Sequence, residues 1–401
     1  MRVLLVNKFY YRRGGDCTAV FAMERLLADK GHDVAVFSMQ YPENIESPWT
    51  EYFPSAIDFS GAGLSGKVAA FMRLFHSREV ARKFESLIAD FRPDVVHLHN
   101  IHSYLSPIVA RIAHRKGIRV VWTLHDYKLI CPSYRCFRNG RVCEACFSSK
   151  TGVIRHKCMK DSRLASMMAY LEACYWNRKK LSCVTNVFIS PSDFLKTKMT
   201  EAGFSPEQIA VLPNFMLQKP AVETDKGDYY CYVGRISAEK GIESLLQAAA
   251  HRPYPLKIIG GGPLLETCRE RYPLAHVDFT GQMSPESLYP IVRKARFLVM
   301  PSIWYENNPY SVIEALCMGT PVLGARIGGI PELIREGENG YLFDAGNVAS
   351  LLEKIDLFYS DDAKRFDYAG MASEACDKFA QETFYKRLME IYSGLCCACK
   401  P

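Results

Sequence analysis

The sequence predicts an α/β protein with two parallel β-sheets, each covered by helices on both faces. Short apolar segments of strand length alternate with longer amphipathic segments along the whole chain, which is typical of parallel sheets. The 401 residues are enough for two domains with separate cores. A polar stretch containing prolines, residues 213–228, divides the pattern and predicts an interdomain linker.

The first half carries five predicted strands and five predicted helices. Its strands are expected at residues 2–6, 33–38, 94–98, 119–124 and 184–189. Its helices are expected at residues 17–30, 66–91, 104–116, 162–180 and 192–201.

The second half repeats the alternation after the linker. Its strands are expected at residues 229–233, 256–259, 276–280, 297–300 and 321–324, followed by helices that end with residues 381–392. We therefore expect domains at residues 1–215 and 216–378, with a C-terminal segment at 379–401.

Composition and charge exclude several classes of protein. A hydrophobic content of 48% and a charged content of 23% are ordinary for globular proteins. No apolar run approaches the roughly 20 residues that span a bilayer, and the first residues lack a signal-peptide pattern, so we expect a cytoplasmic protein. The net charge of +7 is too diffuse to indicate nucleic-acid binding, but it suits anionic substrates or lipids.

The most informative motif follows the predicted strand 297–300. Glu306 and Glu314 are separated by seven residues, the first in a loop and the second in the following helix. Asn308 is expected to cap this helix, with Pro309 in its first position and Gly319 at its end. Carboxylates at the carboxyl edge of a parallel sheet predict a ligand site, where they accept hydrogen bonds from sugar or ribose hydroxyls.

Cations and glycines follow two other predicted strands of the second half. Arg235 and Lys240 come directly after the strand 229–233, where they are expected to neutralise a diphosphate. Gly260, Gly261 and Gly262 follow the strand 256–259 and permit close approach of the backbone to a ligand.

In this order, the three motifs resemble glycosyltransferase family 4, the retaining nucleotide-sugar transferases of the GT-B fold. The resemblance implies two Rossmann-like domains that face a cleft, with the chain's end crossing back to the first domain. It also implies that Arg235 and Lys240 hold the donor diphosphate, Glu306 contacts the donor sugar and Glu314 binds the ribose. Gly260–Gly262, Tyr310 and Ser311 would complete the donor site. The chain departs from the family at Asn307-Asn308-Pro309, where Pro309 offers no N–H.

The first domain supplies the expected acceptor side. Gly14 and Gly15 follow the first strand and lead into a helix expected to be capped by Asp16. The resemblance implies that the two glycine amides lie near the reacting phosphate; the alternative is a plain strand-to-helix turn.

Histidines gather after two neighbouring strands of this domain. His97, His99 and His102 follow the third strand, and His125 with Asp126 follows the fourth. Their spacing is not typical of zinc ligands. His125 matches the family's cleft histidine and is the predicted contact to donor sugar or acceptor, while Asp126 and His99 are predicted to bind the acceptor.

These features predict a glycosyltransferase that uses a UDP- or GDP-linked sugar and a glycan or lipid-linked acceptor in cell-surface polysaccharide synthesis. His125, Glu306, Arg235 and Lys240 are the predicted catalytic residues, and no cofactor is expected for catalysis. The alternatives are a non-catalytic nucleotide- or partner-binding protein, a sugar-nucleotide epimerase or a phosphorylase on the same fold.

Cysteines are unusually concentrated between residues 131 and 158. The chain has 15 cysteines, and a C-x4-C-x6-C-x2-C pattern with a turn at Asn139-Gly140 resembles a zinc knuckle. We expect a structural Zn²⁺ held by Cys131, Cys136, Cys143 and Cys146; reduced thiols without a ligand are the alternative. Cys158 lies in the same segment, and the terminal Cys396, Cys397 and Cys399 allow lipidation, metal binding or an unstructured tail.

Two basic segments of the first domain suggest contact with a membrane. Residues 66–84 form an amphipathic pattern with Lys67, Arg73, Arg78, Arg82 and Lys83, and residues 155–180 contain a second basic set. Such helices usually pack on their own sheet. Two of them in one domain nevertheless predict peripheral docking on an anionic leaflet at the inner face of the plasma membrane.

Overall fold

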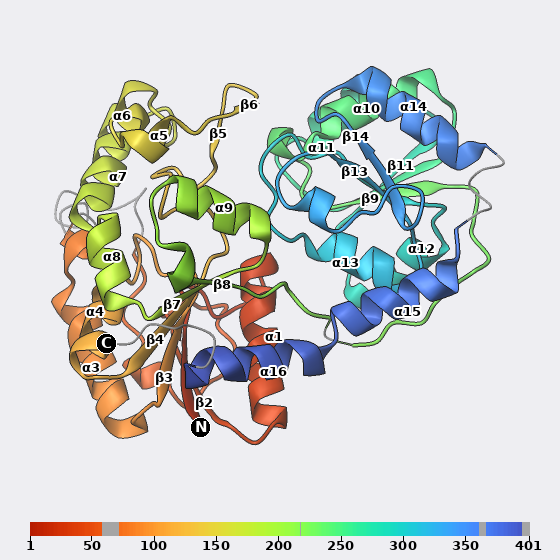
Figure 1. The fold of residues 1–401 in the computed structure, drawn as a ribbon. Helices are drawn as coiled ribbons and strands as arrows, with labels where there is room; N and C mark the ends of the chain where they lie inside the picture. The colour runs from red at the N-terminus through yellow and green to blue at the C-terminus, as the bar shows by residue number, and fades with distance from the viewer. Residues whose placement is uncertain (58–71, 217, 361–365, 395–401) are drawn as a thin grey trace. The chain divides into compact units, whose positions relative to one another are not determined.

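A computed structural model describes residues 1–57, 72–216, 218–360 and 366–394. These residues form two compact units (Figure 1). The first comprises residues 1–135, 144–212 and the C-terminal residues from Tyr385, and the second comprises residues 136–143 and 213–384. Residues 66–71 of one predicted helix, which include Lys67, and the terminal cysteines Cys396, Cys397 and Cys399 lie outside the described residues.

The first unit is built on a parallel sheet of six strands in the order β2-β1-β3-β4-β7-β8. Its strands are β1 (Arg2–Val6), β2 (Asp33–Phe37), β3 (Val95–Leu98), β4 (Arg119–Thr123), β7 (Val187–Ser190) and β8 (Ile209–Val211). Nearly all their residues are buried, because helices cover both faces of a parallel sheet. The short strand β8 is absent from the predicted set.

The helices of the first unit lie on both sides of this sheet (Figure 1). They are α1 (Gly15–Asp29), α3 (Arg78–Phe91), α4 (Ile108–Arg115), α7 (Arg163–Tyr175), α8 (Arg178–Val184), α9 (Asp193–Glu201) and α16 (Gln381–Ser393), with the short α5 (Ala145–Ser148) and α6 (Gly152–Arg155). From α16, Tyr392 reaches both the sulfur of Met23 on α1 and the ring of His97 on β3. Helix α16 therefore packs into the core of this unit.

Two long predicted helices are interrupted in the structure. The predicted helix 66–91 is broken at His76–Ser77, where the Ser77 hydroxyl accepts a hydrogen bond from Val80 N and starts α3. The predicted helix 162–180 is divided into α7 and α8 at Trp176–Asn177, and the Asn177 side chain caps α8. Both predictions were wrong for the same reason: a capping side chain in mid-pattern satisfies the amides of a new helix.

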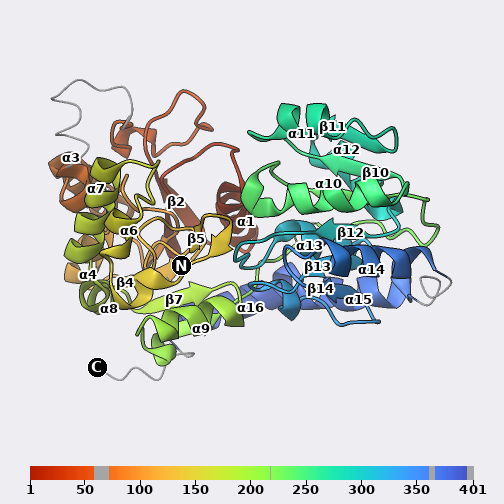
Figure 2. The ribbon, with the colours of Figure 1, turned by 90° about the horizontal axis from the view of Figure 1, so that it is seen from above.

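The second unit contains another six-stranded parallel sheet, in the order β11-β10-β9-β12-β13-β14. Its strands are β9 (Tyr230–Val233), β10 (Leu256–Ile259), β11 (Val277–Gly281), β12 (Leu298–Met300), β13 (Val322–Ala325) and β14 (Gly340–Phe343). Its helices are α10 (Ile242–His251), α11 (Leu265–Arg271), α12 (Pro285–Lys294), α13 (Tyr310–Cys317), α14 (Val348–Tyr359) and α15 (Tyr368–Lys378). One hydrophobic cluster joins the sheet to α12, α13 and α15, which lie below the sheet in Figure 1, and another joins it to α10, α11 and α14. Figure 2 shows the same unit from above. The predicted α/β class with two parallel sheets is confirmed.

Strand order changes direction at one place in each sheet. In the first sheet β1 has β2 on one side and β3 on the other, and in the second sheet β9 has β10 on one side and β12 on the other. Loops leaving the carboxyl ends of two such strands run in opposite directions and leave room for a ligand. The loops after β1 and β3, and those after β9 and β12, are therefore where ligand-binding residues are expected.

Within the described ranges, no helix has both the length and the apolar character needed to cross a bilayer.

Candidate functional site

In the second unit, Glu306 receives three hydrogen bonds on a single oxygen. Glu306 lies in the loop after β12 and is 7% exposed. Its Oε1 accepts from Lys240 Nζ at 2.6 Å, from the Ser302 hydroxyl at 2.6 Å and from Trp304 Nε1 at 2.9 Å. The other carboxylate oxygen, Oε2, takes part in none of these contacts.

The charge of Glu306 is maintained by these partners. Burial alone would raise the pKa of this carboxyl, but the Lys240 charge and the hydrogen bonds together lower it below its usual value. Lys240 belongs to the loop after β9, at the end of a short 3₁₀ turn (Ala238–Lys240). The pair therefore joins the loops of β9 and β12, the two strands at which strand order reverses.

Arg235 complements this buried pair with an exposed cation. It follows β9 directly, and its side chain is exposed, whereas that of Lys240 is 22% exposed. A partly buried ammonium and an exposed guanidinium after one strand suit an anion with several oxygens, such as a diphosphate.

Glycines near this pair are required by close backbone contacts. A Cβ on Gly260, whose φ is +141°, would lie 2.0 Å from the Gly234 carbonyl oxygen, and a Cβ on Gly262 would lie 2.3 Å from that of Ile236. Gly261 has open space at its Cβ position. Close packing against the loop after β9 thus explains why glycine stands at positions 260 and 262, whereas Gly261 faces open space.

Two glycines that were not among the predicted site residues contact the backbone carbonyl of Glu306. Gly329 N donates to the Glu306 carbonyl at 2.7 Å. Gly328 has φ +62°, and a Cβ there would lie 2.3 Å from the same carbonyl oxygen. The Gly-Gly dipeptide after β13 was a visible signal, but only the fold shows which backbone it approaches.

Glu314 occupies the second turn of α13 and is held differently. Its Oε1 accepts from the Tyr289 hydroxyl at 3.1 Å. Burial raises the pKa of Glu314 to about 7, and the Tyr289 hydrogen bond only partly opposes that shift. Tyr310, in the first turn of α13 beside Ser311, has a buried hydroxyl with no hydrogen-bond partner among the described residues.

The start of α13 differs from the prediction. Asn308 does not cap the helix; the helix begins at Tyr310, with Pro309 in the capping position. Instead, Asn308 Oδ1 accepts from Asn214 N at 2.8 Å, and its carbonyl accepts from Asn214 Nδ2 at 2.7 Å. The predicted end is confirmed, because Gly319 has φ +73° directly after the last turn.

In the first unit, the loops after β1 and β3 are hydrogen-bonded together. Asn100 N donates to Asn7 Oδ1 at 3.1 Å, and Asn100 Nδ2 donates to Asp16 Oδ2 at 2.7 Å. Asp16 therefore does not cap α1 as predicted; the capping position is Gly14, and no side chain caps it. Gly14 and Gly15 are exposed at the start of this helix, where an anion would be favoured.

Three histidines form a stack at the ends of β3 and β4. The rings of His97 and His99 lie 4.5 Å apart, and those of His99 and His125 lie 5.2 Å apart. His99 Nδ1 and His125 Nε2 share a hydrogen bond of 2.9 Å. His97 bridges Tyr392 and Thr123. His97 and His99 are fully buried, so His125 is the member of this stack with partial exposure.

The stack is electrically neutral near pH 7. Burial lowers the pKa of His125 to about 4, and nearby Asp16 only partly offsets this. Burial also lowers the pKa of His97 to about 3 and holds that of His99 well below its usual value. A neutral imidazole can donate or accept a hydrogen bond, but it carries no positive charge.

Asp126, next to His125, is fixed by its own loop. Its Oδ1 accepts from Lys128 N at 2.8 Å, closing a local turn. Burial raises the pKa of Asp126, while the charges of Lys8 and Lys128 lower it.

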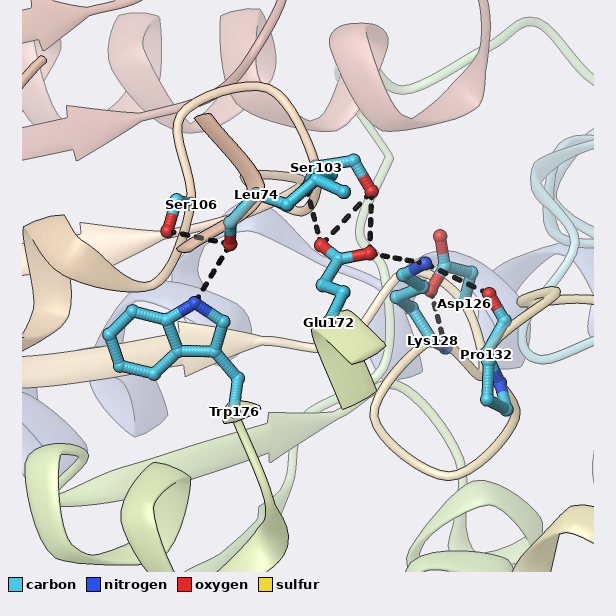
Figure 3. Close-up of polar contacts among 8 residues, drawn as sticks. All are labelled: Leu74, Ser103, Ser106, Asp126, Lys128, Pro132, Glu172 and Trp176. Atoms are coloured by element: carbon cyan, nitrogen blue, oxygen red, sulfur yellow. Dashed lines mark hydrogen bonds and ion pairs between the residues drawn. The ribbon is translucent and has the colours of Figure 1, made fainter. Parts of the chain in front are cut away.

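A buried network around Glu172 was missed by the sequence interpretation (Figure 3). Glu172 projects from α7 and is 3% exposed. It accepts hydrogen bonds from Ser103 N at 2.9 Å and from the Ser103 hydroxyl, and it pairs with Lys128 Nζ at 2.9 Å. Lys128 Nζ also donates to the Pro132 carbonyl at 2.8 Å. One helix thereby holds the loop after β3 and the loop that carries Asp126.

The cysteine-rich segment contains a two-stranded antiparallel hairpin, β5 (Phe137–Arg138) and β6 (Arg141–Val142). Its predicted turn is confirmed, because Asn139 and Gly140 both have positive φ. A hydrogen bond with Cys131, together with burial, raises the pKa of Cys146.

Four cysteines of this segment are predicted to bind zinc. In residues 1–57, 72–216, 218–360 and 366–394, no three His, Cys, Asp or Glu side chains are grouped as a metal site. Zinc binding by Cys131, Cys136, Cys143 and Cys146 stays a prediction.

Comparisons with protein families agree with this geometry. Residues 14–216, just over half of the chain, match the model described as Glycosyltransferase Family 4, and residues 216–374 match that of Glycosyl transferases group 1. A Klebsiella pneumoniae relative, described as an uncharacterized 42.6 kDa protein in the cps region, is 27% identical over 91% of this chain and 95% of its own length. A GDP-mannose-dependent alpha-mannosyltransferase of Corynebacterium glutamicum is 30% identical, over 41% of this chain and 39% of that enzyme.

Solved structures share the fold across the whole chain. Sucrose-phosphate synthase from Thermosynechococcus elongatus has a TM-score of 0.72 at 18% identity and covers 99% of this chain and 100% of its own. The Anabaena protein HepE in complex with UDP-glucose has a TM-score of 0.67 at 17% identity and covers 98% of this chain and 100% of its own. The fold of the chain is thus that of the GT-B glycosyltransferases.

Proposed function

Because this chain belongs to glycosyltransferase family 4, we propose that it transfers a sugar, with retention of configuration, from a UDP- or GDP-linked donor to a glycan or lipid-linked acceptor in cell-surface polysaccharide synthesis. Three comparisons support the classes of substrate. HepE is solved with UDP-glucose, the Corynebacterium glutamicum relative is named for GDP-mannose, and the Klebsiella relative is named for the cps region.

The observation that carries this proposal is the Lys240–Glu306 pair at the point where strand order reverses in the second sheet. Lys240 and Arg235 hold the donor diphosphate and stabilise its charge as it departs. Glu306 is kept ionised, and Oε2, which is outside the three hydrogen bonds, accepts from a hydroxyl of the donor sugar.

Nucleotide recognition is assigned to α13 and its surroundings. Glu314 hydrogen-bonds the ribose hydroxyls, and the Tyr310 hydroxyl, which lacks a protein partner among the described residues, contacts the donor together with Ser311. The amides of Gly14 and Gly15 approach the reacting phosphate, and Gly261 lines the nucleotide pocket with Gly260 and Gly262.

The reaction proposed is direct attack on the same face from which the nucleotide leaves. The bond from the anomeric carbon to the diphosphate oxygen breaks, and a bond to the acceptor oxygen forms. The acceptor proton passes to the departing phosphate oxygen, so neither an oxidant nor a cofactor is needed. A covalent intermediate on Glu306 is the alternative, but its pairing with three donors reduces the nucleophilicity of its Oε1.

Acceptor binding is assigned to the first unit. His125 is neutral and partly exposed, so it suits a hydrogen bond to the acceptor or donor-sugar hydroxyl. Asp126 adds an acceptor contact, and His99 acts on the acceptor through its hydrogen bond to His125. The proposed location is the cytoplasm, with peripheral contact at the inner face of the plasma membrane.

Release of nucleoside diphosphate tests this proposal directly. The full chain is incubated with a panel of UDP- and GDP-sugars, with and without a prenyl-diphosphate glycan, and the anomeric configuration of the product is determined by NMR. We expect release that depends on the acceptor and a product of retained configuration. Donor binding without turnover over the whole panel would favour a non-catalytic nucleotide-binding protein, and an altered donor sugar would favour an epimerase.

A further inference from the structure

Helix α7 presents a stripe of apolar side chains away from its own unit. Leu164 is 71% exposed, Met167 is 42% exposed and Leu171 is 37% exposed. At three and seven residues from Leu164, the other two lie on the same side of the helix. The buried residues of α7 are Ser166, Ala169 and Glu172, so the stripe is on the opposite side.

The stripe is not needed to hold α7 in place. On the inner side, Glu172 pairs with Lys128 and accepts hydrogen bonds from Ser103 (Figure 3). Directly after the helix, Trp176 Nε1 donates to the Leu74 carbonyl at 3.0 Å. Because these buried contacts fix the helix, no contact among the described residues of the unit requires three large apolar side chains on its outer side.

Exposed cations border the stripe at both ends. Lys157, Lys160 and Arg163 precede it, and residues 178–180 (Arg-Lys-Lys) follow it, all with exposed side chains. Between residues 155 and 180 the acidic residues are Asp161 and Glu172, and Glu172 is buried against Lys128. Arg163 occupies the first position of α7, where a positive charge is disfavoured by the helix dipole. Its presence there is therefore unexplained by helix stability.

We infer that this face of α7 docks on an anionic lipid bilayer. The apolar stripe on α7 has cations before it, up to Arg163 in its first turn, and cations after it, at the start of α8. This pattern matches a helix lying in the membrane interface, with Leu164, Met167 and Leu171 among the acyl chains. Lysine and arginine at the ends reach the phosphate groups. The surface lies outside the residues assigned to substrate binding, so vesicle binding is measurable with no substrate present.

Vesicle flotation of the full chain tests the docking surface. We expect binding to vesicles of phosphatidylcholine mixed with phosphatidylglycerol, weaker binding as salt rises, and little binding to phosphatidylcholine alone. The variant Leu164→Gln/Met167→Gln/Leu171→Gln should lose at least about tenfold in apparent affinity. The variant Lys157→Gln/Lys160→Gln/Arg163→Gln should lose roughly a hundredfold, since each cation near the surface contributes about fivefold.

Matched controls are available on other surfaces. Ile45 is 42% exposed and Arg25 is largely exposed, so Ile45→Gln and Arg25→Gln remove an apolar group and a charge without touching α7. Leu164→Gln alone changes the most exposed residue of the stripe, so it should leave the packing of α7 on its unit intact. The inference is refuted if the wild type does not bind anionic vesicles. It is also refuted if both triple variants bind these vesicles as well as the Ile45→Gln and Arg25→Gln controls do. It is also refuted if the stripe variant converts a dimer to a monomer in light scattering, since a second copy would then be the occupant.

Discussion

Replacement of Lys240 by alanine should reduce both activity and stability. The substitution leaves the Glu306 carboxylate buried, with Ser302 and Trp304 as its remaining donors. Breaking a buried ion pair from one side costs several kcal/mol, and the two remaining hydrogen bonds reduce that to roughly 2–3 kcal/mol here. For a domain of this size, the expected fall in melting temperature is about 5–10 °C.

Arg235→Ala provides the matched comparison. Arg235 is exposed, so its removal should leave the melting temperature nearly unchanged. Both variants should slow transfer by about a hundredfold or more, because each removes a charge that stabilises the departing diphosphate. Calorimetry and a nucleoside-diphosphate release assay on the same preparations separate the two effects.

The double variant Lys240→Ala/Glu306→Gln decides whether the buried charge causes the instability. A glutamine at 306 retains an oxygen for Ser302 and Trp304 but carries no charge, so the double variant should melt above Lys240→Ala. Equal melting temperatures for Lys240→Ala and Arg235→Ala, or no recovery in the double variant, would refute the electrostatic reasoning. Activity within a few-fold of wild type in both single variants would refute the diphosphate assignment.

Four further predictions follow from the same contacts. Glu314→Ala should weaken the binding of free nucleoside diphosphate in titration calorimetry, whereas Glu306→Ala should mainly lower turnover. An unchanged affinity of Glu314→Ala for nucleoside diphosphate would count against a contact between Glu314 and the ribose. Because the pKa of Glu314 is raised from 4.5 to about 7, the folded state loses stability as pH rises through this range. Glu314→Gln should therefore gain on wild type by up to roughly 3 kcal/mol above pH 7 and not below pH 4.5, as urea unfolding at several pH values would show. Lys128→Met should raise the KM for acceptor more than the KM for donor. Equal changes in the two KM values would contradict the role of Lys128 in positioning the loop that carries Asp126. Elemental analysis of protein purified without chelator should find one zinc per chain. A zinc content well below one equivalent, with freely titratable thiols, would show that Cys131, Cys136, Cys143 and Cys146 are reduced cysteines without a metal.

Much of the fold was predictable because its signals are local. Apolar runs of strand length produced ten of the strands, and the cations and carboxylates that follow them are necessarily at the carboxyl edge of a parallel sheet. The pairing of Lys240 with Glu306, 66 residues apart, was not visible, but both residues could be placed near one ligand. Gly319 was predictable because a left-handed residue after a helix strongly favours glycine.

Other features depend on contacts that the sequence does not reveal. Asn308 has the chemistry of a helix cap, but its partner Asn214 lies 94 positions earlier. Glu172 is a charged residue on an amphipathic helix, which ordinarily indicates a solvated face. Only the fold shows that Ser103 and Lys128, 69 and 44 positions before it, meet it in the interior.

The Glu172 network also sets a rule for exchanging specificity between relatives. Lys128 in the loop after β4 pairs with Glu172, which lies 44 residues later in the chain, on α7. A chimera that receives only the loop from a relative would place the relative's residue at position 128 against Glu172, which pairs with lysine in this chain. Ser103, Lys128 and Glu172 therefore have to be transferred together, as a single graft from three separate parts of the chain, if the recipient is to keep this loop folded.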